Sequence, residues 1–154
     1  MVSPNRLTQV TLFQGLDAKH LNLVADQFST AAFDAGETVF DQGAPANRVY
    51  IVANGKVVIR FKPYDGDLLD VSEIEKDGIF GWSSVLGRKR YTSSAVCLED
   101  TETFWIRGDV LRELAEDHPE TGVIILERLA EVIAQRLQST HKHVVQLISS
   151  GINK

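Results

Sequence analysis

Hydrophobic residues near the start of the chain recur three or four positions apart, at Leu21, Val24, Ala25 and Phe28. This spacing is typical of one face of an amphipathic helix. Asp17 stands just before them, and its carboxylate can accept hydrogen bonds from the free N–H groups of a first helical turn. The pattern therefore predicts a helix that begins near residue 18.

The pattern changes in the middle of the chain, where hydrophobic residues form short runs between turn residues. The turn residues recur at intervals of roughly ten positions, at Gly36, Gly43, Asn54-Gly55, residues 63–67 and Asp77-Gly78. Short strands at such regular spacing are typical of a sandwich, a jelly roll or a barrel. We therefore expect a mainly β fold.

Two of the connections between these strands are expected to form hairpins. Asn54-Gly55 separates two hydrophobic runs, and Asn-Gly readily takes the positive φ angles of a type I′ turn. Residues 91–98 and 101–107 flank Glu99-Asp100 in a similar way. Each pair of strands is therefore predicted to lie side by side in one sheet.

Helical spacing returns after residue 107. Asp109 can cap a helix over residues 110–117, and His118-Pro119 should end it. A long helix is then predicted, with Pro119 near its start. Its hydrophobic residues form a stripe at Leu126, Leu129, Ile133, Leu137, Thr140, Val144 and Leu147, and Ile125 and Val132 add a second apolar face.

The length of this last helix bears on how the protein assembles. About thirty residues form roughly 45 Å of helix, which is longer than one small roll can cover. One interpretation is a homodimer, in which the stripe packs against the same helix of a second copy. The other is that the stripe folds back onto its own domain.

Composition and charge exclude several classes of protein. The chain has 154 residues, enough for a single domain with its own core, and its net charge of −5 is unfavourable for binding the phosphate backbone of nucleic acids. An apolar run of about 18 residues and a hydrophobic signal core are both missing, so neither a membrane span nor export is expected. Cys97 is the only cysteine, which fits a reducing cytoplasm.

No group of residues predicts catalysis, so we expect a protein that is not an enzyme and requires no cofactor. Residues 81–87, GWSSVLG, do not form a Gly-x-Ser-x-Gly nucleophile elbow. His141 and His143 are two positions apart, about 200° around a helix, and so they cannot chelate one metal ion. No metal site is expected either.

Several motifs follow one another in a fixed order, at residues 12–28, 33–59, 77–84 (DGIFGWSS) and 98–114. Five glycines mark turns within them, at Gly36, Gly43, Gly55, Gly78 and Gly81. With these motifs the chain resembles the cyclic-nucleotide-binding domain of the catabolite-activator and fumarate/nitrate-regulator superfamily. The resemblance covers about residues 10–145.

This resemblance implies a β-roll, also called a double-stranded β-helix or jelly roll. An N-terminal helix and a long C-terminal dimerisation helix would flank it. Residues 1–118 would contain the first helix, the roll and its exit helix, and residues 119–154 would form the dimerisation helix of the same domain.

The resemblance also implies a ligand site around residues 77–84, where a short helix presents backbone N–H groups to a ligand phosphate. The implied ligand-binding residues are Phe80, Gly81, Trp82, Ser83, Ser84, Tyr91 and Thr92, with Thr140 and His141 closing the site from the long helix. Helix capping is the alternative interpretation of Ser83 and Ser84.

Two of these positions depart from the family pattern. Trp82 stands where the family has a glutamate that binds the ribose, and Tyr91 stands where it has an arginine that binds the phosphate. A tyrosine hydroxyl cannot form a bidentate, charge-assisted pair with phosphate. The implied pocket is therefore more neutral and aromatic, and Arg90, Arg60 or Lys62 would have to replace the lost charge.

Three functions are compatible with this resemblance. The first is a homodimeric regulatory or sensor domain for a small effector, with cyclic AMP and cyclic GMP as candidates and a downstream protein as a further partner. The second is a degenerate, ligand-free scaffold, in which Trp82 and Tyr91 are core residues. The third is a site for haem or an apolar effector. DNA binding is not expected, because residues 148–154 cannot form the helix-turn-helix of the family's transcription factors.

Overall fold

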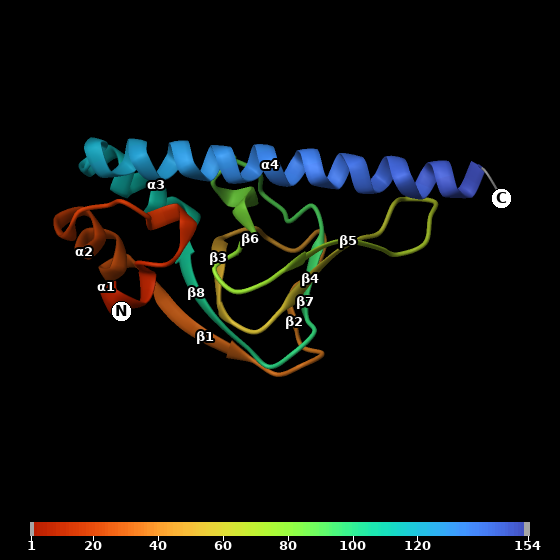
Figure 1. Ribbon diagram of the computed structural model, residues 1–154, viewed down its shortest axis with the longest axis horizontal. Helices are drawn as coiled ribbons and strands as arrows, with labels where there is room; N and C mark the ends of the chain where they lie inside the picture. Colours follow the sequence, from red (N-terminus) through yellow and green to blue (C-terminus); the bar gives the residue numbers. More distant parts are fainter. Residues whose placement is uncertain (1, 153–154) are drawn as a thin grey trace.

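Two four-stranded antiparallel sheets form a roll beneath a long helix (Figure 1). The computed structural model describes residues 2–152, except for the side chains of residues 140, 143, 144, 147, 148 and 150–152. The first sheet has the strand order β1 (Ser29–Phe33), β8 (Thr101–Arg107), β3 (Arg48–Asn54) and β6 (Ile79–Phe80). The second has the order β2 (Thr38–Phe40), β7 (Ser94–Cys97), β4 (Val57–Phe61) and β5 (Leu69–Ile74). The predicted β-roll is confirmed.

Helices flank this roll at both ends of the sequence, and one short 3₁₀ turn, η2 (Trp82–Ser84), lies within it. The flanking helices are α1 (Pro4–Leu7), the 3₁₀ turn η1 (Thr11–Phe13), α2 (Ala18–Gln27), α3 (Gly108–Asp117) and α4 (Pro119–Ile152). The predicted cap of α2 is confirmed, because the His20 N–H donates to the Asp17 carboxylate at 3.0 Å. The predicted break at His118-Pro119 also lies where α3 ends and α4 begins.

Strand β3 is buried on both faces, because it lies between two hydrophobic cores. Val49 and Ile51 belong to the core under the helices, whereas Tyr50 and Val52 belong to the core inside the roll. Successive side chains of a strand point to opposite faces. A run of four buried residues is therefore what a strand with a core on each side requires.

Both predicted hairpins are wrong. Strand β3 pairs with β6 and β8, while β4 pairs with β5 and β7, so Asn54-Gly55 joins two different sheets. Glu99-Asp100 likewise connects β7 of the second sheet to β8 of the first. Among the described residues only Asp77 combines a side chain with a positive φ, so Asn54 does not take the φ of a type I′ turn.

The chain crosses from one sheet to the other at Asn54-Gly55 and again at Glu99-Asp100. Close packing of these two crossings explains why a glycine is present at position 55. Gly55 has φ 107°, and a Cβ atom there would lie 2.5 Å from Thr101 Oγ1 and 2.6 Å from the Asp100 carbonyl oxygen. The two crossings therefore pack backbone against backbone at one corner of the roll. The glycine that resembles a hairpin signal is needed for this contact.

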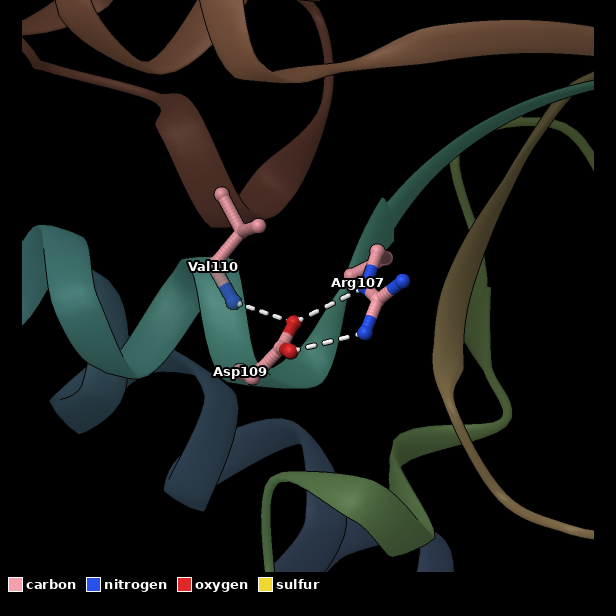
Figure 2. Close-up of polar contacts among 3 residues, drawn as sticks. All are labelled: Arg107, Asp109 and Val110. Carbon is pink, nitrogen blue, oxygen red and sulfur yellow. Dashed lines mark hydrogen bonds and ion pairs between the residues drawn. The ribbon is translucent and has the colours of Figure 1, made fainter.

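Asp109 stabilises the start of α3 from inside its first turn (Figure 2). Its Oδ1 atom accepts a hydrogen bond from the Val110 N–H at 2.8 Å. Oδ1 and Oδ2 also accept hydrogen bonds from Nε and Nη2 of Arg107, at 3.0 and 2.8 Å respectively. The hydrogen bond from Arg107 is the main reason why the pKa of Asp109 lies below its usual value. The N-cap is Arg107, so the predicted capping position was wrong by two residues.

Helix α4 packs into the hydrophobic core with its first half only. Its 34 residues form about 51 Å of helix, and its C-terminal part extends beyond the roll in Figure 1. Ile125 and Leu129 are buried, and Val132 and Ile133 pack partly against the same core. Leu137 of the predicted stripe is 63% exposed. Packing of α4 against its own domain therefore buries the predicted hydrophobic stripe only as far as Ile133.

No helix within residues 2–152 is long and apolar enough to cross a membrane.

Gly55→Ala should destabilise the fold more than Gly36→Ala. Gly36 also has a positive φ, 89°, but nothing lies within 4 Å of a Cβ atom placed there. We expect a loss of about 1–2 kcal/mol for Gly36→Ala from backbone strain alone, and about 1–3 kcal/mol more for Gly55→Ala from steric overlap. Urea unfolding of both variants measures the difference, and equal losses would contradict the packed corner.

Candidate functional site

The predicted ligand-binding segment forms a tight turn between β6 and η2. Gly81 links the two elements with φ 76°, in the left-handed region. A Cβ atom on it would lie 3.0 Å from Phe40 Cε2 and 3.3 Å from both the Arg48 carbonyl oxygen and Tyr50 Cδ2. Glycine is therefore required here both for its backbone conformation and for its lack of a side chain.

A cluster of aromatic rings supports this turn from inside the roll. Tyr50 stacks on Phe80 with 5.1 Å between ring centroids, and Tyr91 stacks on Phe40 with 3.7 Å between centroids and an interplanar angle of 10°. All four rings are buried. Because they contact each other and Gly81, they hold the turn in a fixed position relative to the second sheet.

A pocket of about 370 Å³ lies beside the turn, between the second sheet and α4. Its apolar lining includes Phe40, Ile59, Phe61, Leu69, Val71 and Leu137, and its polar lining consists of Ser72, Ser83, Thr92, Ser93 and Arg136. Small-molecule sites typically measure about 300–1,000 Å³ and are mostly apolar with a few polar groups. The pocket has the size and the surface of such a site.

Six of the nine residues proposed from the sequence line this pocket, namely Phe80, Gly81, Trp82, Ser83, Tyr91 and Thr92. The Ser84 side chain is instead turned toward Gly108, and its buried Oγ has no hydrogen-bond partner within the described part of the chain. His141 is exposed and does not line the pocket. The side chain of Thr140 lies outside the described residues.

Tyr91 forms a wall of the pocket, and its hydroxyl group is already engaged. The hydroxyl donates to the Arg48 carbonyl oxygen at 2.8 Å and accepts the Arg48 N–H at 3.1 Å. Burial raises the pKa of the phenol above its usual value, and the hydrogen bonds to the backbone at Arg48 act in the opposite direction. Tyr91 therefore presents an aromatic ring to the pocket and connects the segment before β7 to the start of β3.

The three cations expected to replace the missing charge do not line the pocket. The Arg90 guanidinium donates to the Gly43 carbonyl oxygen at 2.8 Å, and Arg60 pairs with Asp70 at 2.8 Å. Lys62 is exposed. Two of the three are thus held by other contacts at the surface.

Arg136 of α4 is the cation that reaches the pocket, and the sequence analysis missed it. Its guanidinium carbon lies 5.0 Å from the centroid of the Trp82 ring, within cation–π range. The side chain is half-buried, and burial lowers the pKa of the guanidinium below its ordinary value. The one available signal was its place one helical turn before Thr140, on the face implied to close the site.

The pocket has one cationic group and no acidic group among the residues that the structure describes. None of these residues gives Arg136 a carboxylate or another hydrogen-bond acceptor. Arginine remains protonated at physiological pH. The pocket therefore carries a positive charge near Trp82 that no described residue neutralises.

The chain matches known proteins over most of its length. The family model of the cyclic nucleotide-binding domain matches residues 30–118. The CRP-like cAMP-activated global transcriptional regulator of Mycobacterium tuberculosis (strain H37Rv) is 30% identical over 146 residues, which are 95% of this chain and 63% of that protein. The chain thus spans less than two thirds of this relative.

Two solved structures have the same fold. The catabolite activator protein of Thermus thermophilus superposes with a TM-score of 0.74 and 26% identity, over 94% of this chain and 63% of that one. A cyclic nucleotide-binding domain from Methylobacillus flagellatus KT superposes with a TM-score of 0.82 over 92% of this chain and 80% of that one. At 15% identity, the second likeness concerns the fold alone.

Tyr91→Phe should lower the free energy of unfolding by about 1–3 kcal/mol, because the substitution removes the partner of two Arg48 backbone groups. Tyr64→Phe is the matched control, since Tyr64 is 100% exposed and should change stability by no more than about 0.5 kcal/mol. Urea unfolding of both variants measures the contrast. A Tyr91→Phe variant as stable as the control would mean that the hydroxyl plays no structural role.

Proposed function

Since this chain belongs to the cyclic nucleotide-binding domain family, we propose that it is a regulatory domain that binds a small effector between the roll and α4. The observation that carries this proposal is the pocket of about 370 Å³ beside the Gly81 turn. The Ser83 and Thr92 hydroxyl groups and the Arg136 guanidinium would supply its polar contacts. In this proposal the domain is cytoplasmic and has no catalytic activity of its own.

The position of α4 suggests how an effector would change the protein. Arg136 and Leu137 form part of the pocket wall, and both belong to the long helix. An effector that contacts them would favour the position of α4 in which these contacts are made. A ligand shifts a conformational equilibrium only by its difference in affinity for the two states, and these contacts would provide that difference.

Cyclic AMP and cyclic GMP are the first effectors to test, although we expect neither to bind as tightly as a site with the family's arginine would allow. The M. tuberculosis relative is described as cAMP-activated. In this chain Trp82 can only donate a hydrogen bond through its indole N–H, and the Tyr91 hydroxyl is held by Arg48. Two of the usual contacts to a cyclic nucleotide would be lost.

A ligand-free scaffold is the second candidate, and the burial of Tyr91 favours it. Only 5% of Tyr91 is exposed, and its ring and hydroxyl both make contacts of a core residue. Trp82 does not fit this alternative as well, because it is only partly buried and lines the pocket. We therefore keep the effector-binding domain as the first proposal.

We also propose that a second copy of the chain packs along α4, and that a downstream protein responds to the dimer. Leu137 is exposed on the face where the predicted hydrophobic stripe continues. An apolar side chain of this size in a stripe on a long helix is typical of a helix–helix interface.

Thermal unfolding with added cyclic AMP or cyclic GMP tests the effector proposal. A ligand at one hundred times its Kd adds about 2.7 kcal/mol, which should raise the Tm by roughly 2–6 °C in a domain of this size. Gly81→Val should abolish the shift, because its side chain would press on Phe40 and Tyr50 and require a left-handed backbone. ATP and haem serve as comparison ligands.

Gly87→Val is the matched control for this substitution. Gly87 has φ 79°, so it imposes a similar backbone cost, but nothing lies within 4 Å of a Cβ atom there. It should keep the ligand-induced shift. The site assignment is wrong if Gly81→Val binds as well as the native chain, and the scaffold becomes the better proposal if no ligand raises the Tm.

Leu137→Glu should convert the proposed dimer into a monomer, because a charge would be placed in an apolar interface. Lys142→Glu is the control, since residue 142 is exposed and lies about 140° around the helix from residue 137. Sedimentation equilibrium at several protein concentrations measures the molecular mass of each variant. A Leu137→Glu protein that remains dimeric would exclude this face of α4 as the interface.

A further inference from the structure

One wall of the pocket is a continuous apolar surface. Ile59 and Phe61 of β4 and Leu69 and Val71 of β5 form it, at a place where the register between the two strands shifts. Phe61 and Leu69 are direct partners across the two strands. All four line the pocket. This surface suits an aromatic or aliphatic group, and Ser72 is the one hydroxyl side chain that β4 and β5 contribute to the described lining.

The positive charge of the pocket comes from a different element. Arg136 belongs to α4, and its guanidinium carbon lies 5.0 Å from the ring centroid of Trp82, which directly follows Gly81 in the turn. A half-buried cation without an acceptor is costly, because it has lost part of its hydration and has gained only the face of the Trp82 ring in return. An anionic group on a ligand would provide that acceptor.

The remaining polar side chains, Ser72, Ser83, Thr92 and Ser93, are uncharged, so the pocket is poorly suited to a highly charged ligand. No carboxylate of the described residues lines the pocket to accept hydrogen bonds from sugar hydroxyls. The Tyr91 hydroxyl already makes two hydrogen bonds to Arg48. One guanidinium can balance one negative charge, so a ligand with several phosphates would bring unpaired charge into the site.

From this arrangement we propose that the effector is a small amphipathic organic acid, with one anionic group on Arg136 and an apolar body on the β4–β5 surface. This inference rests on the proposed function, because it names the class of ligand for the same pocket. The pocket volume of about 370 Å³ is near the lower end of the range for small-molecule sites, which limits the ligand to about two or three aromatic rings or an aliphatic group of similar size.

Two fluorescent probes with the same apolar body test the proposal. 1-Anilinonaphthalene-8-sulfonate carries one anionic group, and N-phenyl-1-naphthylamine is the same ring system without it. Arg136→Gln should weaken binding of the sulfonate probe roughly tenfold or more, because the substitution removes a charge-assisted contact. The affinity of the neutral probe should change by less than about twofold. Its continued binding would also show that the pocket of the variant is still folded.

Lys142→Gln is the matched control, since it removes a positive charge from an exposed position on the same helix. It should leave both probes within about twofold of the native chain, as expected for an exposed charge. In competition, 1-naphthoate should displace the sulfonate probe at lower concentrations than cyclic AMP does, although both competitors carry a single negative charge.

The outcomes separate this inference from the proposed function. Val71→Trp fills the pocket, and if both probes still bind to it unchanged, the pocket is not their site and the proposed function fails. If Val71→Trp blocks both probes but Arg136→Gln affects them equally, the pocket binds ligands and only the organic-acid inference is overturned. Tighter competition by cyclic AMP than by 1-naphthoate would overturn it as well.

Discussion

The burial of β3 on both faces is the constraint on which the rest of the structure depends. Because its side chains alternate between two hydrophobic cores, the strand can neither slip nor rotate without exposing one set of them. Strand β6 pairs with β3 and leads directly into Gly81. Arg48, at the start of β3, holds the Tyr91 hydroxyl. Both the turn and the aromatic wall of the pocket are thus positioned by one strand.

Tyr91 is a structural residue of this fold. It contributes two hydrogen bonds to β3 and a stacked contact with Phe40. Arg60 and Arg90 make other contacts and do not line the pocket. Positive charge reaches the pocket from α4 instead, through Arg136 over Trp82. Ligand recognition would then depend on the helix more than on the roll.

Two predictions from short stretches of the sequence were correct, because neighbouring residues alone decide these features. Asp17 caps its helix, and His118-Pro119 separates two others. The prediction of a hairpin at Asn54-Gly55 was wrong, because the strands on either side of it pair with distant strands in two different sheets. The glycine is required because Thr101 lies too close to leave room for a side chain. The turn at Gly81 was predictable as a contiguous motif. Arg136 was not, since its contact with the pocket depends on how a distant helix lies across the roll.

Leu137 gives the pocket an unusual property, because the same side chain lines the cavity and is 63% exposed to solvent. Anything that covers this part of α4 also forms a roof over the bound molecule. Binding of an effector in the pocket and binding of a partner to α4 are then linked, so that each changes the affinity of the other by the same factor. If a second copy of the chain covers α4, as proposed above, the apparent affinity for an effector would vary with the concentration of the protein itself.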